Sequence, residues 1–139
     1  GDTGFTTDLP KALYHLLKAK GWRTSLIVSS LNRNMLYTIQ DAGWADGVNL
    51  NLMQVYGATI SPSANEIAIV KQLGFRYINV NVNDWSFSTV NYAKDIGLYV
   101  AGWHWQLTNC EAANSSANGY DLDIMMTDCI GNLQAKGWF

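Results

Sequence analysis

The chain has 139 residues, of which 48% are hydrophobic and 14% charged, so it can bury one core and is too short for two ordinary domains. Its net charge of −2 comes without a run of Lys or Arg, which excludes the basic surface that nucleic-acid binding requires. No apolar stretch approaches the roughly 20 residues of a membrane-spanning helix, so no membrane span is expected. Six Trp and seven Tyr among so few charges are typical of sugar-facing or extracytoplasmic proteins, although the compartment itself is not encoded.

A short pattern recurs along the chain, in which a helical stretch is followed by Gly and then by a large apolar residue that opens a strand. The glycines of this pattern are Gly21, Gly43, Gly74, Gly97, Gly119 and Gly137. Each suits the left-handed residue just past a helix C-terminus. The spacing of roughly 20 to 30 residues is that of one helix, one strand and two loops. The pattern therefore indicates a series of βα units.

The first predicted helix runs from Asp8, its N-cap, through Pro10 to Lys20. Further helices are predicted at 32–42, 63–73 and 88–96, in a short stretch after Cys110, and at 130–136. Between them, strands are predicted at 25–30, 47–53, 77–82, 98–105 and 122–127. Strands that alternate with helices predict a parallel sheet with right-handed crossovers.

Five parallel strands fit either part of an eight-stranded TIM-like barrel or a doubly wound, flavodoxin-like sheet. The segments 48–52 and 78–83 place Asn at every second position, whereas a strand covered by helices on both faces should be almost wholly apolar. A barrel strand has one face on the helices and one on the interior, so the alternation favours a partial barrel. Either Val28, Leu50, Leu52 and Val80 or their alternating neighbours are expected to point inward.

The stretch from 93 to 128 contains AlaLysAspIleGlyLeuTyrValAlaGlyTrpHisTrpGln and then LeuAspIleMetMetThrAsp. It resembles the end of the glycerophosphodiester phosphodiesterases, in which a strand ending Trp-Thr-Val-Asn precedes a last strand Asp-Gly-Ile-Ile-Thr-Asp. Trp103 matches the family Trp, Gln106 replaces its Asn, and Asp123 with Thr127 and Asp128 matches the last strand. Upstream, Ser30 and Leu31 resemble the Ser-Phe that ends another family strand.

This resemblance implies that residues 1–139 form a single domain equivalent to the last five βα units of the family barrel. In the family, the earlier strands carry a His-Arg pair, a Glu-x-Asp pair, a second His and a further Glu, which bind a divalent cation such as Mg²⁺ or Ca²⁺. This chain has only His15 and His104 and no Glu-x-Asp, so no catalytic residue, metal ligand or cofactor is assigned to it. We therefore expect no catalysis from the isolated chain.

In parallel αβ folds the site lies at the carboxyl ends of the strands. The predicted substrate-binding residues there are Ser30, Asn81, Asn83, Trp103 and Gln106. These side chains are uncharged, hydrogen-bonding or aromatic, which suits a glycerol or sugar moiety better than it suits proton transfer. The resemblance implies that Trp103 forms the apolar wall beside the glycerol carbons.

Three other residues near strand ends have a plainer interpretation. Alternation places His104 on the face opposite Trp103, towards the helices, where a structural role is expected. Asp128 is expected to cap the following helix, and Asp84 to cap a helix or form a turn. Cys110 and Cys129 follow adjacent predicted strands at one end, so an oxidising compartment would permit a disulfide between them.

Two functions follow as hypotheses. The first is a glycerophosphodiester phosphodiesterase-like domain, inactive alone, which contacts a glycerophosphodiester or sugar-like ligand. The second is a non-enzymatic glycerol- or sugar-binding or structural module. Because a partial barrel leaves its first and last strands and its interior open, we also expect it to self-associate or to pair with a missing N-terminal half.

Overall fold

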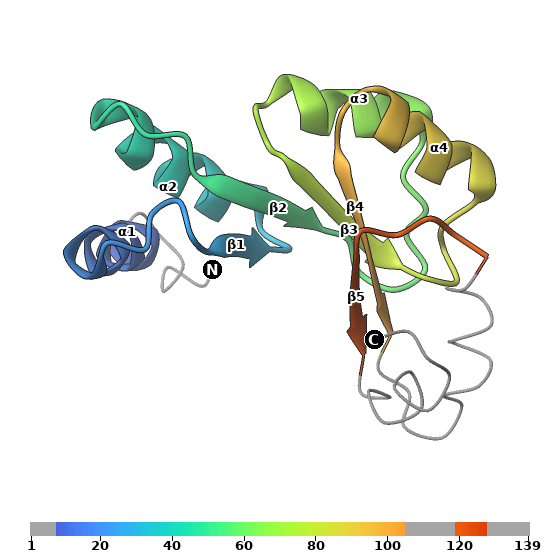
Figure 1. The fold of residues 1–139 in the computed structure, drawn as a ribbon, viewed down its shortest axis with the longest axis horizontal. Helices are drawn as coiled ribbons and strands as arrows, with labels where there is room; N and C mark the ends of the chain where they lie inside the picture. The colour runs from blue at the N-terminus through green and yellow to red at the C-terminus, as the bar shows by residue number, and fades with distance from the viewer. Residues whose placement is uncertain (1–7, 105–118, 128–139) are drawn as a thin grey trace, which may run out of the picture.

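The computed structural model describes residues 8–104 and 119–127, and the elements in these ranges alternate as predicted (Figure 1). The helices are α1 (Asp8–Lys20), α2 (Arg33–Ala45), α3 (Ala64–Gln72) and α4 (Phe87–Asp95). The strands are β1 (Ile27–Ser30), β2 (Asn51–Val55), β3 (Tyr77–Asn81), β4 (Tyr99–His104) and β5 (Ile124–Thr127). The helices predicted after Cys110 and at 130–136 lie outside the described residues.

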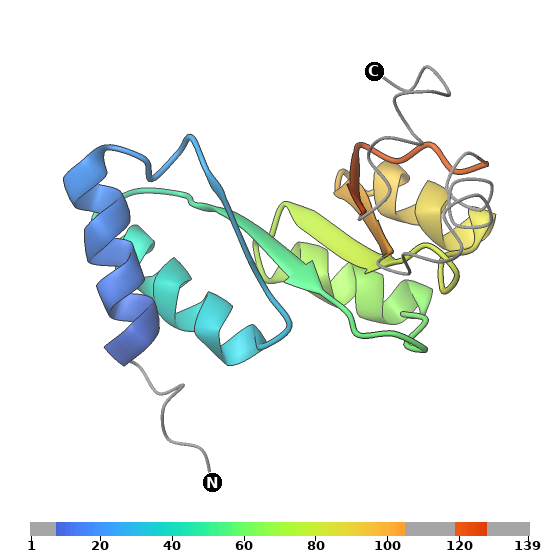
Figure 2. The same ribbon diagram turned by 90° about the horizontal axis from the view of Figure 1, so that it is seen from below.

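All four strand pairings are parallel, and the strands follow one another in the order β1-β2-β3-β4-β5. A doubly wound sheet reverses its strand order at a switch point, whereas a barrel adds each strand beside the last. Figures 1 and 2 show the sheet turning strongly from β2 to β5. The fold is therefore a curled half-barrel, and the flavodoxin-like alternative is excluded.

One face of the sheet packs against the helices. Val28, Leu50, Leu52, Ile78 and Val80 all belong to or pack on a single apolar core, together with residues of the helices such as Leu36, Ile67 and Val90. The residues that alternate with them consequently point to the other face, which would be the barrel interior. They include Asn51, Asn79 and Asn81. The alternating Asn residues are thus on the inner side of the curled sheet.

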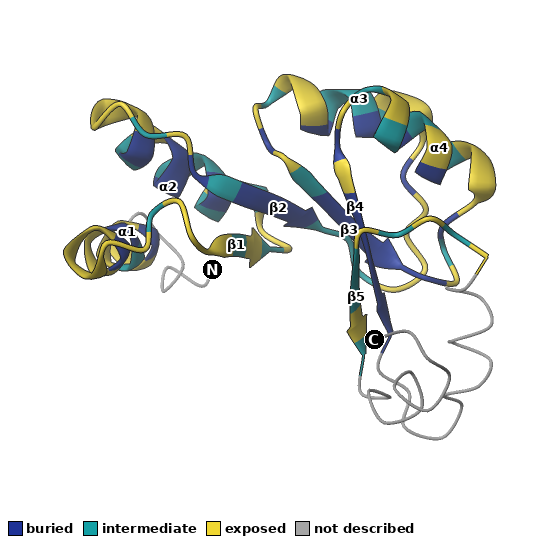
Figure 3. Cartoon of the chain, in the orientation of Figure 1, coloured by how far each residue is buried: buried dark blue, intermediate teal, exposed yellow. Residues whose placement is uncertain are grey.

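This inner face is only partly covered by the described residues. Ile27, Tyr99 and Met126 lie on it with exposed fractions of 41%, 52% and 40%. Tyr77 stacks on Tyr99 with ring centroids 5.0 Å apart. Figure 3 shows the central strands largely buried and the outer strands β1 and β5 largely not. The inner face is therefore best covered at its centre and open towards its edges.

The glycine pattern is correct at three described positions and wrong at Gly43. Gly21, Gly74 and Gly97 have positive φ, as the helix-ending role requires. Gly43 instead lies inside α2, where a Cβ would stand 2.9 Å from the carbonyl oxygen of Val48. The helix continues to Ala45, and Gly47 adopts the left-handed conformation. Glycine is needed at position 43 because the backbone of Val48 approaches it closely. β2 starts at Asn51 instead of residue 47 because α2, and with it the turn, ends later than predicted.

Candidate functional site at the carboxyl ends of the strands

Ser30 ends β1 at the edge where the carboxyl ends of all five strands meet. Its Oγ accepts a hydrogen bond from the backbone N–H of Asn32 at 2.9 Å. Asn32 is itself the N-cap of α2, with its side chain accepting from the N–H groups of Asn34 and Met35. Ser30 therefore supports the turn into α2, and its own hydroxyl hydrogen points to no acceptor among the described residues.

Asn81 and Asn83 are brought together just past β3. The Oδ1 of Asn81 accepts from the backbone N–H of Asn83 at 2.9 Å, and its carbonyl accepts from the N–H of Asp84 at 2.8 Å. Asp84 thus closes a turn, which is one of the two roles predicted for it. The N-cap of α4 is Ser86. The side-chain NH₂ of Asn81 donates to no described residue, which leaves two donors at this edge.

Trp103 lies beside Asn81 in the register of β3 and β4 and is only 5% exposed. Its Nε1–H donates to the carbonyl oxygen of Tyr56 at 2.9 Å, so the indole spans β3 towards the end of β2. His104, the next residue, is buried and shares the strand face of Val100, which belongs to the helix-side core. Gln106 and Asp128 lie outside the described residues, as do Cys110 and Cys129.

A charged network that the sequence did not reveal joins α2, β2 and α3 at this same edge. Arg33 donates from Nε to Gln54 Oε1 at 3.0 Å and from Nη2 to Glu66 Oε1 at 2.6 Å. The hydroxyl of Tyr56 donates to the same Glu66 oxygen at 2.8 Å. These contacts fix the guanidinium, the phenol and the carboxylate relative to one another.

The ionisation of this network follows from its contacts. Burial raises the pKa of Glu66, but the hydrogen bonds from Arg33 and Tyr56 outweigh it, so the pKa lies below the usual glutamate value. Burial lowers the pKa of Arg33, and the bond to Glu66 outweighs that effect too. Burial, with Glu66 beside it, raises the pKa of the Tyr56 phenol. At neutral pH the network is an ion pair with a neutral tyrosine, so it offers no poised acid or base.

A cavity of about 320 Å³ adjoins this network. It is lined by Leu31, Arg33, Gln54, Val55, Tyr56, Gly57 and Ile60. Leu31 and Ile60 are both exposed and form the apolar part of the cavity rim, beside the Arg33 guanidinium. Nearby, Thr59 has a φ of 66°, which is costly for a β-branched residue, and its N–H is held by Asp84 Oδ2 at 2.8 Å. The loop is thus fixed in a strained conformation next to the cavity.

The described residues do not fit a divalent cation. Across 8–104 and 119–127, no group of three His, Cys, Asp or Glu side chains is placed to hold a metal ion. Glu66 is a carboxylate at this edge, but it is engaged by a guanidinium, and His15 lies exposed on α1. No step of a metal-assisted reaction can be derived from these side chains.

No family model and no curated protein matches the sequence. Solved structures do match the fold. A protein from Galdieria sulphuraria, assigned as a glycerophosphodiester phosphodiesterase, is 12% identical with a TM-score of 0.79, and the match covers 91% of this chain and 49% of that one. An Oleispira antarctica phosphodiesterase, solved with its product sn-glycerol-3-phosphate, is 19% identical with a TM-score of 0.68, covering 95% of this chain and 50% of that one.

The chain has the fold of about half of a glycerophosphodiester phosphodiesterase barrel. A third match, to the glycerophosphodiester phosphodiesterase of Thermotoga maritima, has 14% identity, a TM-score of 0.63 and coverage of 91% of this chain and 54% of that one. The chain therefore spans about half the length of the solved structures that it matches. At such identities the likeness establishes the half-barrel fold only. The chemistry of the chain has to be argued from its own residues. Among the described helices, none is long and apolar enough to cross a membrane.

Proposed function

We propose that this chain provides the glycerol- or sugar-facing wall of a glycerophosphodiester phosphodiesterase-like site and does not hydrolyse phosphodiesters by itself. The observation that carries the proposal is the set of uncharged polar groups at the carboxyl ends of a phosphodiesterase-like half-barrel. Ser30 and Asn81 have donors there without an acceptor among the described residues, and the largely buried Trp103 lies beside Asn81. Asn83 and Gln106 complete the proposed set.

The missing chemistry supports the second part of the proposal. Phosphodiester hydrolysis requires stabilisation of charge on the phosphoryl oxygens and a proton for the leaving alkoxide. Arg33 could meet an anionic oxygen only by sharing its contacts with Glu66, and the pKa values of the network keep both groups ionised. In the family, a divalent cation and His residues on other strands supply what is lacking, so a second segment or chain would have to provide them.

The proposal is tested by activity and binding together. The purified chain should show no turnover of glycerophosphocholine with Mg²⁺ or Ca²⁺. It should nevertheless bind sn-glycerol-3-phosphate, observed as a shift of the Trp103 indole N–H signal by NMR. Asn81→Ala should weaken this binding, whereas Asn91→Ala, which removes an exposed amide from α4, should not. Turnover that disappears in a Ser30→Ala variant would refute the proposal, as would binding that is insensitive to Asn81.

A non-enzymatic glycerol- or sugar-binding module is the second candidate. It is favoured by the lack of a cluster of acidic and His side chains among the described residues. Such a module would bind glycerol or a neutral sugar as well as it binds glycerol phosphate. A comparison of the two ligands in the same NMR titration therefore separates the candidates.

A further inference from the structure

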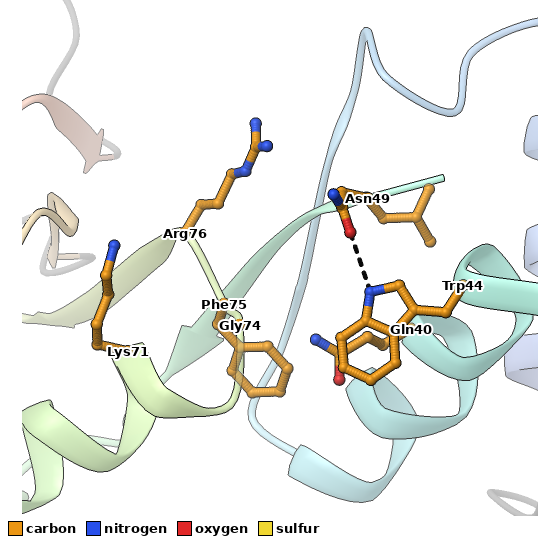
Figure 4. Close-up of a pocket in the computed structure, with 8 residues that line it drawn as sticks. Gln40, Trp44, Asn49, Lys71, Gly74, Phe75 and Arg76 are labelled. Atoms are coloured by element: carbon orange, nitrogen blue, oxygen red, sulfur yellow. Dashed lines mark hydrogen bonds between the residues drawn. The ribbon is translucent and has the colours of Figure 1, made fainter. Parts of the chain in front are cut away.

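Two cavities, each of about 320 Å³, lie at opposite edges of the sheet and differ in their walls. In the cavity at the amino ends of β2 and β3, the charged ends of Lys71 and Arg76 point away from Trp44 (Figure 4). The groups around that cavity therefore do not converge on one ligand. The cavity at the carboxyl ends of the strands adjoins the proposed site and has a largely apolar wall, formed by Leu31, Val55, Gly57 and Ile60.

The apolar part of the carboxyl-end cavity is built around Gly57. A Cβ placed on Gly57 would stand 3.8 Å from Ile60 Cδ1 and 3.9 Å from Leu31 Cδ2, so these two side chains flank the same point from different loops. Leu31 is 65% exposed, the highest fraction among the large hydrophobic side chains described, and Ile60 is 50% exposed. Two exposed aliphatic side chains on either side of a glycine form a slot that suits an apolar group of a ligand.

The backbone that carries these two side chains is held in place. Gln54 is buried and donates from Nε2 to the carbonyl oxygen of Leu31 at 3.3 Å. Directly before Ile60, the N–H of Thr59 donates to Asp84 Oδ2 at 2.8 Å. Because both loops are fixed by these contacts, the slot exists before a ligand enters it, which lowers the entropic cost of binding.

The charges beside the slot compensate each other. Arg33 Nη2 donates to Glu66 Oε1 at 2.6 Å and to the Tyr56 hydroxyl at 3.1 Å. The guanidinium and the carboxylate form an ion pair, so this side of the cavity has no net charge to attract a second ion. The apolar wall therefore determines which group of a ligand the cavity prefers.

The cavity is adjacent to the proposed glycerol-facing wall. Leu31 directly follows Ser30 in the chain. Tyr56 lines the cavity, and its carbonyl oxygen accepts from Trp103 Nε1–H at 2.9 Å. A ligand whose glycerol lies against Ser30 and Trp103 would consequently place a substituent of that glycerol at the cavity.

We propose that the cavity binds the alkyl or acyl chain of a single-chain lipid, whose glycerol phosphate head lies in the proposed site. The placement of the head rests on the proposed function, whereas the chain is assigned from the cavity itself. The chain would pack between Leu31 and Ile60 over Gly57 and lose its contact with water there. The ligand class is then a lysolipid instead of a fully water-soluble glycerophosphodiester.

The test is an NMR titration of the whole chain with sn-glycerol-3-phosphate and with its butanoyl, hexanoyl and octanoyl monoesters, each kept below its critical micelle concentration. The reporters are the methyl signals of Leu31 and Ile60, assigned by their loss in Leu31→Ser and Ile60→Ser. Each added CH₂ should tighten binding about two- to fourfold, so the octanoyl ester should bind at least about tenfold more tightly than the butanoyl ester.

Matched variants show whether the chain lies in this cavity. Ile60→Ser should lower the octanoyl-to-butanoyl affinity ratio about threefold or more, and Gly57→Leu, whose side chain would fill the slot, should remove the gain with chain length. Leu16→Ser removes an aliphatic side chain of the same 50% exposure from α1 and should leave the ratio unchanged. The proposal is overturned if no ester binds, if all esters bind equally, or if Leu16→Ser lowers the ratio as much as Ile60→Ser.

The same titration separates this proposal from the proposed function. If sn-glycerol-3-phosphate shifts the Trp103 indole signal and the esters bind no better, the chain site is refuted and the proposed function stands. If the affinity rises with chain length at Leu31 and Ile60 while Asn81→Ala has no effect, the cavity binds the chain and the proposed contact to glycerol is refuted.

Discussion

The two faces of this sheet are built from the same strands and differ in how complete they are. On the helix side, Ile78, Val80 and Val100 are fully buried in one core. On the inner side, Tyr99 is half exposed, and the fully buried Asn79 has an Oδ1 without a hydrogen-bond partner among the described residues. Within the described residues, the helix side is a closed core, whereas the inner side is partly open.

The difference between the two faces has a geometric cause. In a closed barrel the inward side chains of all strands fill the interior together. This chain matches about half of each solved barrel, and its described residues cover the inner face only in part. We expect that face to be covered by a second copy of the chain or by a segment equivalent to the N-terminal half of the barrel.

The largest expected effect comes from a matched pair of isoleucines, one on each face. Ile78→Ala removes a fully buried side chain from the helix-side core and should lower the free energy of unfolding by about 2–5 kcal/mol. Ile27→Ala, on the exposed part of the inner face, should change it by about 0.5 kcal/mol or less while weakening self-association. Urea unfolding followed by circular dichroism measures the first quantity. Equal losses in the two variants would contradict the difference between the faces.

Asn79→Leu tests the same difference between the two faces and should have an intermediate effect on stability. The substitution keeps the branched heavy-atom shape of the side chain and removes the unsatisfied Oδ1, at the loss of a contact from Nδ2 to Met126 Sδ. Because an unsatisfied buried polar group costs roughly 1–3 kcal/mol, the stability of the dissociated chain should stay constant or rise by about 1 kcal/mol. Association should weaken if a partner donates to this oxygen. Marked destabilisation under dissociating conditions would show instead that Asn79 supports the monomer.

How far the sequence predicts this fold is clear from β2 and β3. Alternating Asn and apolar residues correctly indicated strands with one polar inner face, because strand periodicity is local. The start of β2 was misplaced, because Gly43 has the same sequence context as a helix-ending glycine and only the contact with Val48 distinguishes it. The end of a helix depends on such tertiary contacts, which a short pattern does not contain.

The candidate site was predictable to a different degree. The polar residues at strand ends, Ser30 and Asn81 among them, could be assigned once the strands were known. The pairing of Arg33 with Glu66 could not, because each alone resembles a solvated charge in the first turn of a helix. These residues are 33 positions apart and meet only when the N-terminal ends of α2 and α3 come to the same edge of the sheet.

The smallest predicted effect concerns acid stability. The pKa of Glu66 is lower in the folded chain than the ordinary value of 4.5, so its carboxylate stabilises the fold above that value, and this contribution is lost as the pH falls through the folded pKa. Because the pair with Arg33 is partly exposed, the contribution should be at most about 1 kcal/mol. Glu66→Gln should remove this part of the pH dependence below 4.5. In Asp41→Asn, which removes an exposed carboxylate without a described ion pair, the dependence should persist.

The central claim, that the inner face is an incomplete core, is tested most directly by the mass of the chain in solution. Multi-angle light scattering at micromolar concentration should give a multiple of the 15.4 kDa chain mass, and Ile27→Ala should shift the distribution towards the monomer. A cooperative, well-folded monomer of 15.4 kDa would contradict the claim.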